Sequence, residues 1–84
     1  MIHVQREGDR AVIDVRELVK KGHHPKGEIF QYVKEAPVGT LLEIHVPHRA
    51  QPLVSGLSAL GLNVIVKELS MDHFLLRTVK LIDS

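Results

Sequence analysis

Histidine is the residue type in this chain with the widest chemical scope. Six histidines occur among 84 residues, and cysteine is absent. An imidazole nitrogen binds zinc, copper, nickel or iron, and it also exchanges protons near neutral pH. Because the chain has no cysteine, it has no thiolate metal ligand, no cysteine nucleophile and no disulfide. The histidines are His3, His23, His24, His45, His48 and His73.

Two helices are expected next to the histidine-rich segments, each opened by a proline. Apolar residues recur at three- and four-residue spacing over residues 26–36 and again over residues 53–60. Pro25 and Pro52 fit the first position of a helix, where the missing proline N–H costs nothing. Gly56, inside the second helix, predicts a close approach to the sheet.

Alternating or β-branched segments predict the strands. An extra strand at residues 2–6, joined by a Gly-Asp hairpin turn, is a further possibility. The remaining order is β-α-β-α-β-β, with a polar connection at residues 16–24. This order predicts a single α+β domain over residues 1–84, a two-layer α/β sandwich with both helices on one face of a mixed sheet. The four expected strands cover residues 11–15, 40–46, 62–69 and 74–82.

This topology gathers histidines at one end of the sheet. In a β-α-β unit both strands run the same way, so both strand-to-helix loops lie at the same end. The first loop carries His23 and His24, and the second carries His48 and Arg49. If the third strand is parallel to the first two, the turn with His73 lies there too. Ligand sites in open α/β sheets lie outside the carboxyl ends of the strands.

Two kinds of site fit these residues. A transition metal or a haem would be held by His23, His48 and His73. Alternatively, the two helix N-termini would attract a carboxylate, phosphate or sulfur oxyanion. The histidines would otherwise be ordinary solvent-exposed loop residues. The expected ligand-binding residues are His23, His24, His48, Arg49, Asp14 and Arg16; the last two are also expected to pair as a salt bridge.

Several function classes are disfavoured by composition. A net charge of +1 and an aromatic content of 4% argue against nucleic-acid binding. No nucleophile elbow or phosphate-binding glycine loop is present, so no enzymatic activity is expected. No apolar run is long enough to span a membrane. The start of the chain has no apolar signal-peptide region, so a cytoplasmic location is expected.

Val12 and Leu41 fall on the uncovered face of the sheet, which predicts a protein partner or a weak homodimer.

The chain resembles the TusA/SirA-like family. The resemblance lies in Ile13-Asp14-Val15-Arg16, the polar loop to Pro25, the amphipathic helix, and the segment from Pro37 to Leu42. It covers about residues 11–81. Members are small sulfur carriers with a Cys-Pro-x-Pro motif, and the resemblance implies a strand order of 1-2-4-3 with the last strand antiparallel. Since persulfide must be carried on sulfur, a chain without cysteine is excluded from sulfur relay.

A cysteine-less relative of that family, domain of unknown function number twenty-two forty-nine, is more similar still. Its Leu-Asp-Val-Arg and His-Asp-Pro-x-Pro-Leu motifs match Asp14, Arg16, His48, Pro52 and Leu53 here, while the residues between His48 and Pro52 differ. The resemblance implies an uncharacterised, non-enzymatic accessory or binding domain. A metal- or haem-binding protein is the alternative. RNA binding is a weaker one, since the topology also resembles the C-terminal domain of translation initiation factor three.

Overall fold

The chain forms a small α+β domain with a mixed sheet. The computed structural model describes residues 2–81. Within that range it has five strands and three helices, and none of the helices is long and apolar enough to cross a membrane. In chain order the elements are β1 (Val4–Glu7), β2 (Arg10–Asp14), α1 (Arg16–Lys20), α2 (Lys26–Glu35), β3 (Leu41–Val46), α3 (Gln51–Ala59), β4 (Ile65–Ser70) and β5 (His73–Val79).

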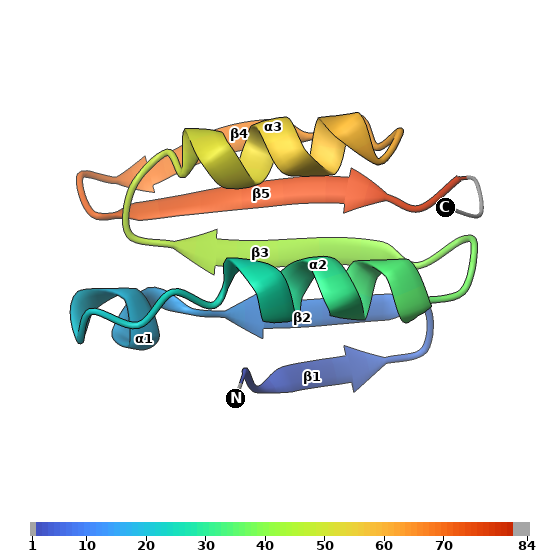
Figure 1. Cartoon of the computed structure of the whole chain (residues 1–84), viewed down its shortest axis with the longest axis horizontal. Helices are drawn as coiled ribbons and strands as arrows, with labels where there is room; N and C mark the ends of the chain where they lie inside the picture. The colour runs from blue at the N-terminus through green and yellow to red at the C-terminus, as the bar shows by residue number, and fades with distance from the viewer. Residues whose placement is uncertain (1, 82–84) are drawn as a thin grey trace.

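The strands lie in the order β1-β2-β3-β5-β4 (Figure 1). β2 and β3 are parallel, while the pairs β1–β2, β3–β5 and β4–β5 are antiparallel. The N-terminal strand, which the sequence leaves as a possibility, is therefore present, although it covers Val4–Glu7 rather than residues 2–6. It adds an edge strand that the four-strand order 1-2-4-3 does not contain. The turn between β1 and β2 places Gly8 at φ 56°, a conformation that glycine adopts without penalty.

The segment expected to be an irregular connection, residues 16–24, begins instead with the short helix α1. Leu18 and Val19 are partly buried and pack against the core, and this packing explains why the segment forms a helix. Gly22, at φ 88°, ends the turn, and the His23 N–H donates to the Leu18 carbonyl at 2.9 Å. Two apolar residues in five are too weak a pattern to predict a helix, so the sequence interpretation was wrong here.

Helices α2 and α3 lie side by side over one face of the sheet (Figure 1). The buried core lies beneath them, on the inward side of β2, β3 and β5. Gly56 of α3 explains their close approach, because a Cβ at this position would collide with the ring of Phe30 on α2. The expected close contact therefore exists, but with a neighbouring helix rather than with the sheet. The most buried core side chains include Ile13, Ile29, Leu42, Ile44, Leu57 and Leu76.

Lys80 is a fully buried cation, only 1% exposed. Its ammonium group donates to three backbone carbonyls at the end of α2, those of Val33 (2.9 Å), Lys34 (2.8 Å) and Ala36 (2.7 Å). The last carbonyls of a helix have no partners inside the helix and carry its negative dipole end. Lys80 therefore caps α2 from the segment that follows β5 and ties that segment to the end of the helix.

Candidate functional site

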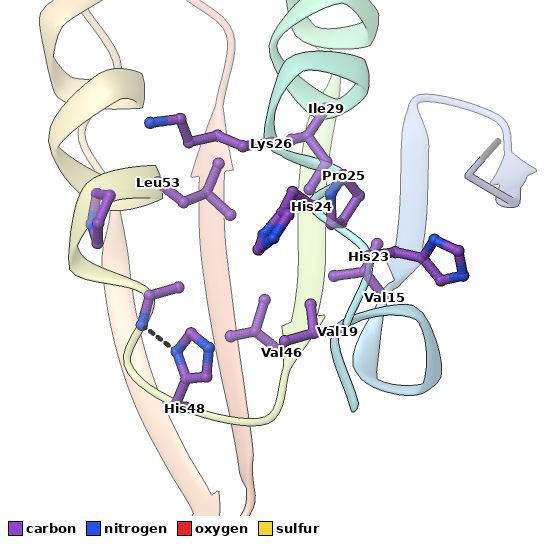
Figure 2. A pocket seen from close by; sticks show the side chains of 12 residues that line it. Val15, Val19, His23, His24, Pro25, Lys26, Ile29, Val46, His48 and Leu53 are labelled. Atoms are coloured by element: carbon purple, nitrogen blue, oxygen red, sulfur yellow. Dashed lines mark hydrogen bonds between the residues drawn. The ribbon is translucent and has the colours of Figure 1, made fainter. Parts of the chain in front are cut away.

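A cavity of about 190 Å³ opens where α2 and α3 begin, outside the C-terminal ends of the parallel strands β2 and β3. Its walls come from two stretches of the chain that are distant in the sequence, residues 15–29 and residues 46–53 (Figure 2). Most of the lining is apolar, and much of it belongs to the buried core. The lining residues are Val15, Val19, His23, His24, Pro25, Lys26, Ile29, Val46, His48, Ala50, Pro52 and Leu53.

The structure brings His23, His24 and His48 to this one cavity, as the parallel arrangement of β2 and β3 predicts. His24 points inward from the start of α2, and His48 lies on the opposite side, in the loop before α3 (Figure 2). The His23 ring points away from the cavity. Lys26 reaches toward α3, and its ammonium group lies 5.8 Å from the centre of the Phe30 ring. Two imidazoles and one ammonium group therefore surround the apolar floor.

The loop that carries His48 is held by an unusual backbone turn. Ala50 has φ 52° and ψ 49°, the left-handed conformation, which costs a residue with a Cβ roughly 1–2 kcal/mol. In this turn the Ala50 N–H donates to Nδ1 of His48 at 3.0 Å. Because Nδ1 accepts, the neutral His48 ring carries its proton on Nε2. No sequence signal marks this turn, since alanine is not a residue that favours it.

Arg49 is not part of the cavity. Its guanidinium group lies 5.5 Å above the Phe74 ring and 3.7 Å from the Glu68 carboxylate. Both partners belong to the β4–β5 hairpin, on the side of the loop away from α2. Arg49, which the sequence places among the expected ligand-binding residues, is therefore held away from the cavity by a neighbouring carboxylate and an aromatic ring.

Asp14 and Arg16 form the expected ion pair. Arg16 donates to the Asp14 carboxylate from its backbone N–H (3.1 Å), from Nε (3.1 Å) and from an Nη2 nitrogen (2.8 Å). These bonds, the side-chain ones above all, lower the pKa of the Asp14 carboxyl below its ordinary value. Together with Glu17 and Lys20 the pair lines a separate shallow hollow, so neither residue meets the histidine cavity.

His73 lies apart from the cavity and contacts His45 instead. Nδ1 of His45 and Nε2 of His73 are 2.7 Å apart, and the ring centres are 5.0 Å apart. Successive residues of a strand point to opposite faces, so His45 faces away from Val46, which lines the cavity. The expected set of His23, His48 and His73 is therefore not brought together. Within residues 2–81 no group of three or more His, Cys, Asp or Glu side chains is placed to hold a metal ion.

Sequence reasoning missed the contact between His45 and His73. Burial is the main cause that lowers the pKa of His45; the Asp14 carboxylate raises it, and the nearby His73 ring lowers it further. The contact depends on the pairing of β3 with β5, in which His45 lies opposite Leu75. Neither the pairing nor its register is marked by any residue pattern in the two strands.

Comparison with known proteins adds no relative: no family model, no curated protein and no solved structure matches this chain. The chemistry of the cavity therefore has to be judged from its own residues. Its floor is apolar, and its polar side chains are all bases, with no carboxylate among the lining residues. Such a lining suits a molecule that combines a negative group with some apolar surface.

Proposed function

We propose that this chain is a non-enzymatic binding domain that holds a small anionic molecule in the cavity between α2 and α3. The observation that carries the proposal is the charge character of the lining. His24 and Lys26 carry N–H donors, His48 offers its Nε2–H, and no acidic side chain lines the cavity. A negatively charged group at this rim would meet donors from two separate segments.

We further propose that the domain is a cysteine-less relative of the TusA/SirA-like family. The arrangement of β2, β3, β5 and β4 supports this, since these strands, numbered without β1, correspond to the order 1-2-4-3 that the resemblance implies. Helices α2 and α3 on one face are in keeping with its two-layer architecture. The absence of cysteine separates the chain from the sulfur carriers, because it has no thiol on which to form a persulfide.

Titration of the labelled protein with acetate, inorganic phosphate and thiosulfate tests the binding proposal. We expect saturable NMR shifts at the His24 and His48 imidazoles and at the backbone amides around the cavity. His45 and His73, on the other face of the sheet, provide an internal reference and are expected to stay unchanged. If none of these three anions and none of the longer straight-chain carboxylates produces a saturable shift at concentrations of about 10 mM, the binding proposal is wrong.

A His24→Gln variant sharpens this test. Loss of a charge-assisted hydrogen bond is expected to weaken anion binding about tenfold or more. His3→Gln is the matched control, because His3 is exposed at the start of β1 and does not line the cavity. Equal weakening by both substitutions would indicate a nonspecific charge effect rather than a site.

We also propose that the uncovered face of the sheet contacts a second copy of the chain. Ile65 is 69% exposed and Val79 is 38% exposed, and both lie beside Leu41 around a shallow hollow. Exposed apolar side chains that adjoin one another favour association. Sedimentation at increasing concentration tests this: a rising mass is expected, and Ile65→Lys is expected to abolish it. A monomer at all concentrations would contradict the proposal.

A further inference from the structure

The cavity between α2 and α3 has a floor suited to a short hydrocarbon chain. Val15 and Ile29 are each 1% exposed and Leu53 is 6% exposed, so these side chains are held in place by the core. The volume of about 190 Å³ corresponds to roughly six molecules of liquid water. A floor of this kind stabilises methylene and methyl groups by removing them from water. It is too small for a long fatty acid or a nucleotide.

The rim favours a carboxylate over larger anions. A carboxylate has two oxygens that accept hydrogen bonds, and His24 and His48 offer donors from opposite sides, with the positive charge of Lys26 nearby. A phosphate or sulfate group would bring more oxygens into the same apolar surroundings. Each oxygen without a donor adds to the cost of removing the anion from water.

We infer that the cavity binds a short aliphatic carboxylate, of about four to six carbons. Its tail lies on the floor formed by Val15, Ile29 and Leu53, and its carboxylate lies between His24 and His48. The inference rests on the proposed anion-binding function and adds to it the class of ligand. It also explains why a cavity with basic groups at its rim has an apolar lining.

A series of straight-chain carboxylates tests the inference by its dependence on chain length. Acetate, butyrate, hexanoate and octanoate are titrated into the full chain, with NMR shifts at the cavity as the readout. Each methylene that enters the cavity is expected to tighten binding about fourfold. The gain is expected to stop once the tail exceeds the cavity, so octanoate binds no more tightly than hexanoate. 1-Butanol is expected to bind far more weakly than butyrate, since it lacks the charge.

Two matched substitutions test where the hydrocarbon tail of the bound carboxylate lies. Val19 of α1 is partly buried and lines the cavity, so Val19→Phe is expected to fill the space and remove the dependence on chain length. Val12 of β2 lies on the opposite side of the sheet and is also half-buried, so Val12→Phe makes the same change away from the cavity. Carboxylate affinities of the Val12→Phe protein are expected to match those of the parent. Thermal unfolding verifies that both variants fold.

The possible failures are distinguishable. If phosphate or thiosulfate binds, and butyrate binds no more tightly than acetate, the cavity is a plain anion site; the ligand class is then wrong while the proposed function stands. Equal binding of butyrate and 1-butanol would show that the charge is unused and would also overturn the inference. If no carboxylate and no inorganic anion binds, both the inference and the proposed function fail.

Discussion

The two faces of the sheet treat polar groups in opposite ways, and strand β3 shows the contrast residue by residue. Ile44 and Val46 point toward the helices and are buried among apolar side chains. Glu43 and His45 point to the uncovered face, where each meets polar partners from neighbouring strands. The alternation of a strand therefore places His45 on one side of the sheet and the histidine cavity on the other.

Each face also contains a buried charge, held by different partners. Under the helices, Lys80 is satisfied by backbone carbonyls. On the uncovered face, Glu43 is 8% exposed and is bonded to Arg10 of β2 and Arg77 of β5, whose side chains are half-exposed. The covered face thus relies on fixed, dry contacts, whereas the uncovered face relies on ion pairs that water reaches. A small molecule with an apolar part would therefore meet buried apolar side chains on the covered face, where α2 and α3 begin, and charged groups on the uncovered face.

Lys80→Met is expected to produce the largest effect on stability. The substitution keeps an apolar stem but leaves three carbonyls at the end of α2 without their donor, at a cost of about 3 kcal/mol in the free energy of unfolding. Urea denaturation measures the loss. Lys67→Met, at an exposed lysine of β4, is the matched control and is expected to change stability by less than about 0.5 kcal/mol. If both variants lost the same free energy of unfolding, the Lys80 cap of α2 would not stabilise the fold.

Gly56→Ala tests how closely the covered face is packed. The new methyl group meets the Phe30 ring, and the resulting strain is expected to exceed the gain in helix propensity, with a net loss of about 1 kcal/mol. Gly27→Ala is the control, because a Cβ at that position meets nothing within 4 Å. It is expected to stabilise α2 by up to about 1 kcal/mol. If both variants were stabilised, the close approach of α2 and α3 would be wrong.

Glu43→Gln is expected to have a smaller effect, less than about half of that of Lys80→Met, because the arginine partners are solvated. Its dependence on salt is the sharper measurement. In 1 M NaCl the difference between Glu43→Gln and the parent is expected to shrink, since salt screens half-exposed charges. The loss caused by Lys80→Met is expected to persist in salt. If the two variants depended on salt in the same way, the proposed difference in solvation between the two faces would be wrong.

The smallest expected effect is a dependence of stability on pH that originates at His45. Because the folded state lowers the pKa of His45, the unfolded chain takes up a proton at a higher pH than the folded chain does. The stability from neutral His45 is therefore present above the ordinary value of about 6.5 and is lost as pH falls below it. The slope of unfolding free energy against pH is expected to correspond to a fraction of one proton.

His45→Gln is expected to flatten this slope between pH 7 and 5, while His48→Gln, on the other face, leaves it in place. The lowered pKa of Asp14 acts in a separate window, because its contribution is lost only below about pH 4. Unfolding curves recorded at each pH provide the measurement. If the slope persisted in His45→Gln and disappeared in His48→Gln, the pH dependence would originate at His48, and the prediction for His45 would be wrong.

Much of the secondary structure could be predicted from local patterns. Pro25 and the apolar spacing that follows it fix the start of α2, and the alternation over residues 40–46 identifies β3. Helix α1 could not be predicted in this way, because its five residues are helical owing to their packing against the core and not to a helical pattern of their own. Lys80 was expected to lie within the last strand, and nothing local marks it as the cap of a helix that ends 45 residues earlier.

The candidate site, too, could be predicted only in part. Chain direction alone predicts that His23, His24 and His48 share one end of the sheet, since parallel strands must return through crossover connections. It does not predict where each side chain points: Arg49 turns to Glu68, the His23 ring turns away from the cavity, and His73 meets His45. These orientations depend on the register of β5 and on the left-handed turn at Ala50, which no local signal announces.

Local sequence patterns are enough to predict the order of the principal elements and the end of the sheet at which the loop histidines lie. The reason is that hydrophobic periodicity and proline positions act over a few residues, and chain direction follows from them. Which histidines line the cavity, and which pair across strands, depends on contacts that form only in the folded domain. Those contacts join residues far apart in the chain, and a shift of one residue in strand register would move a side chain to the opposite face.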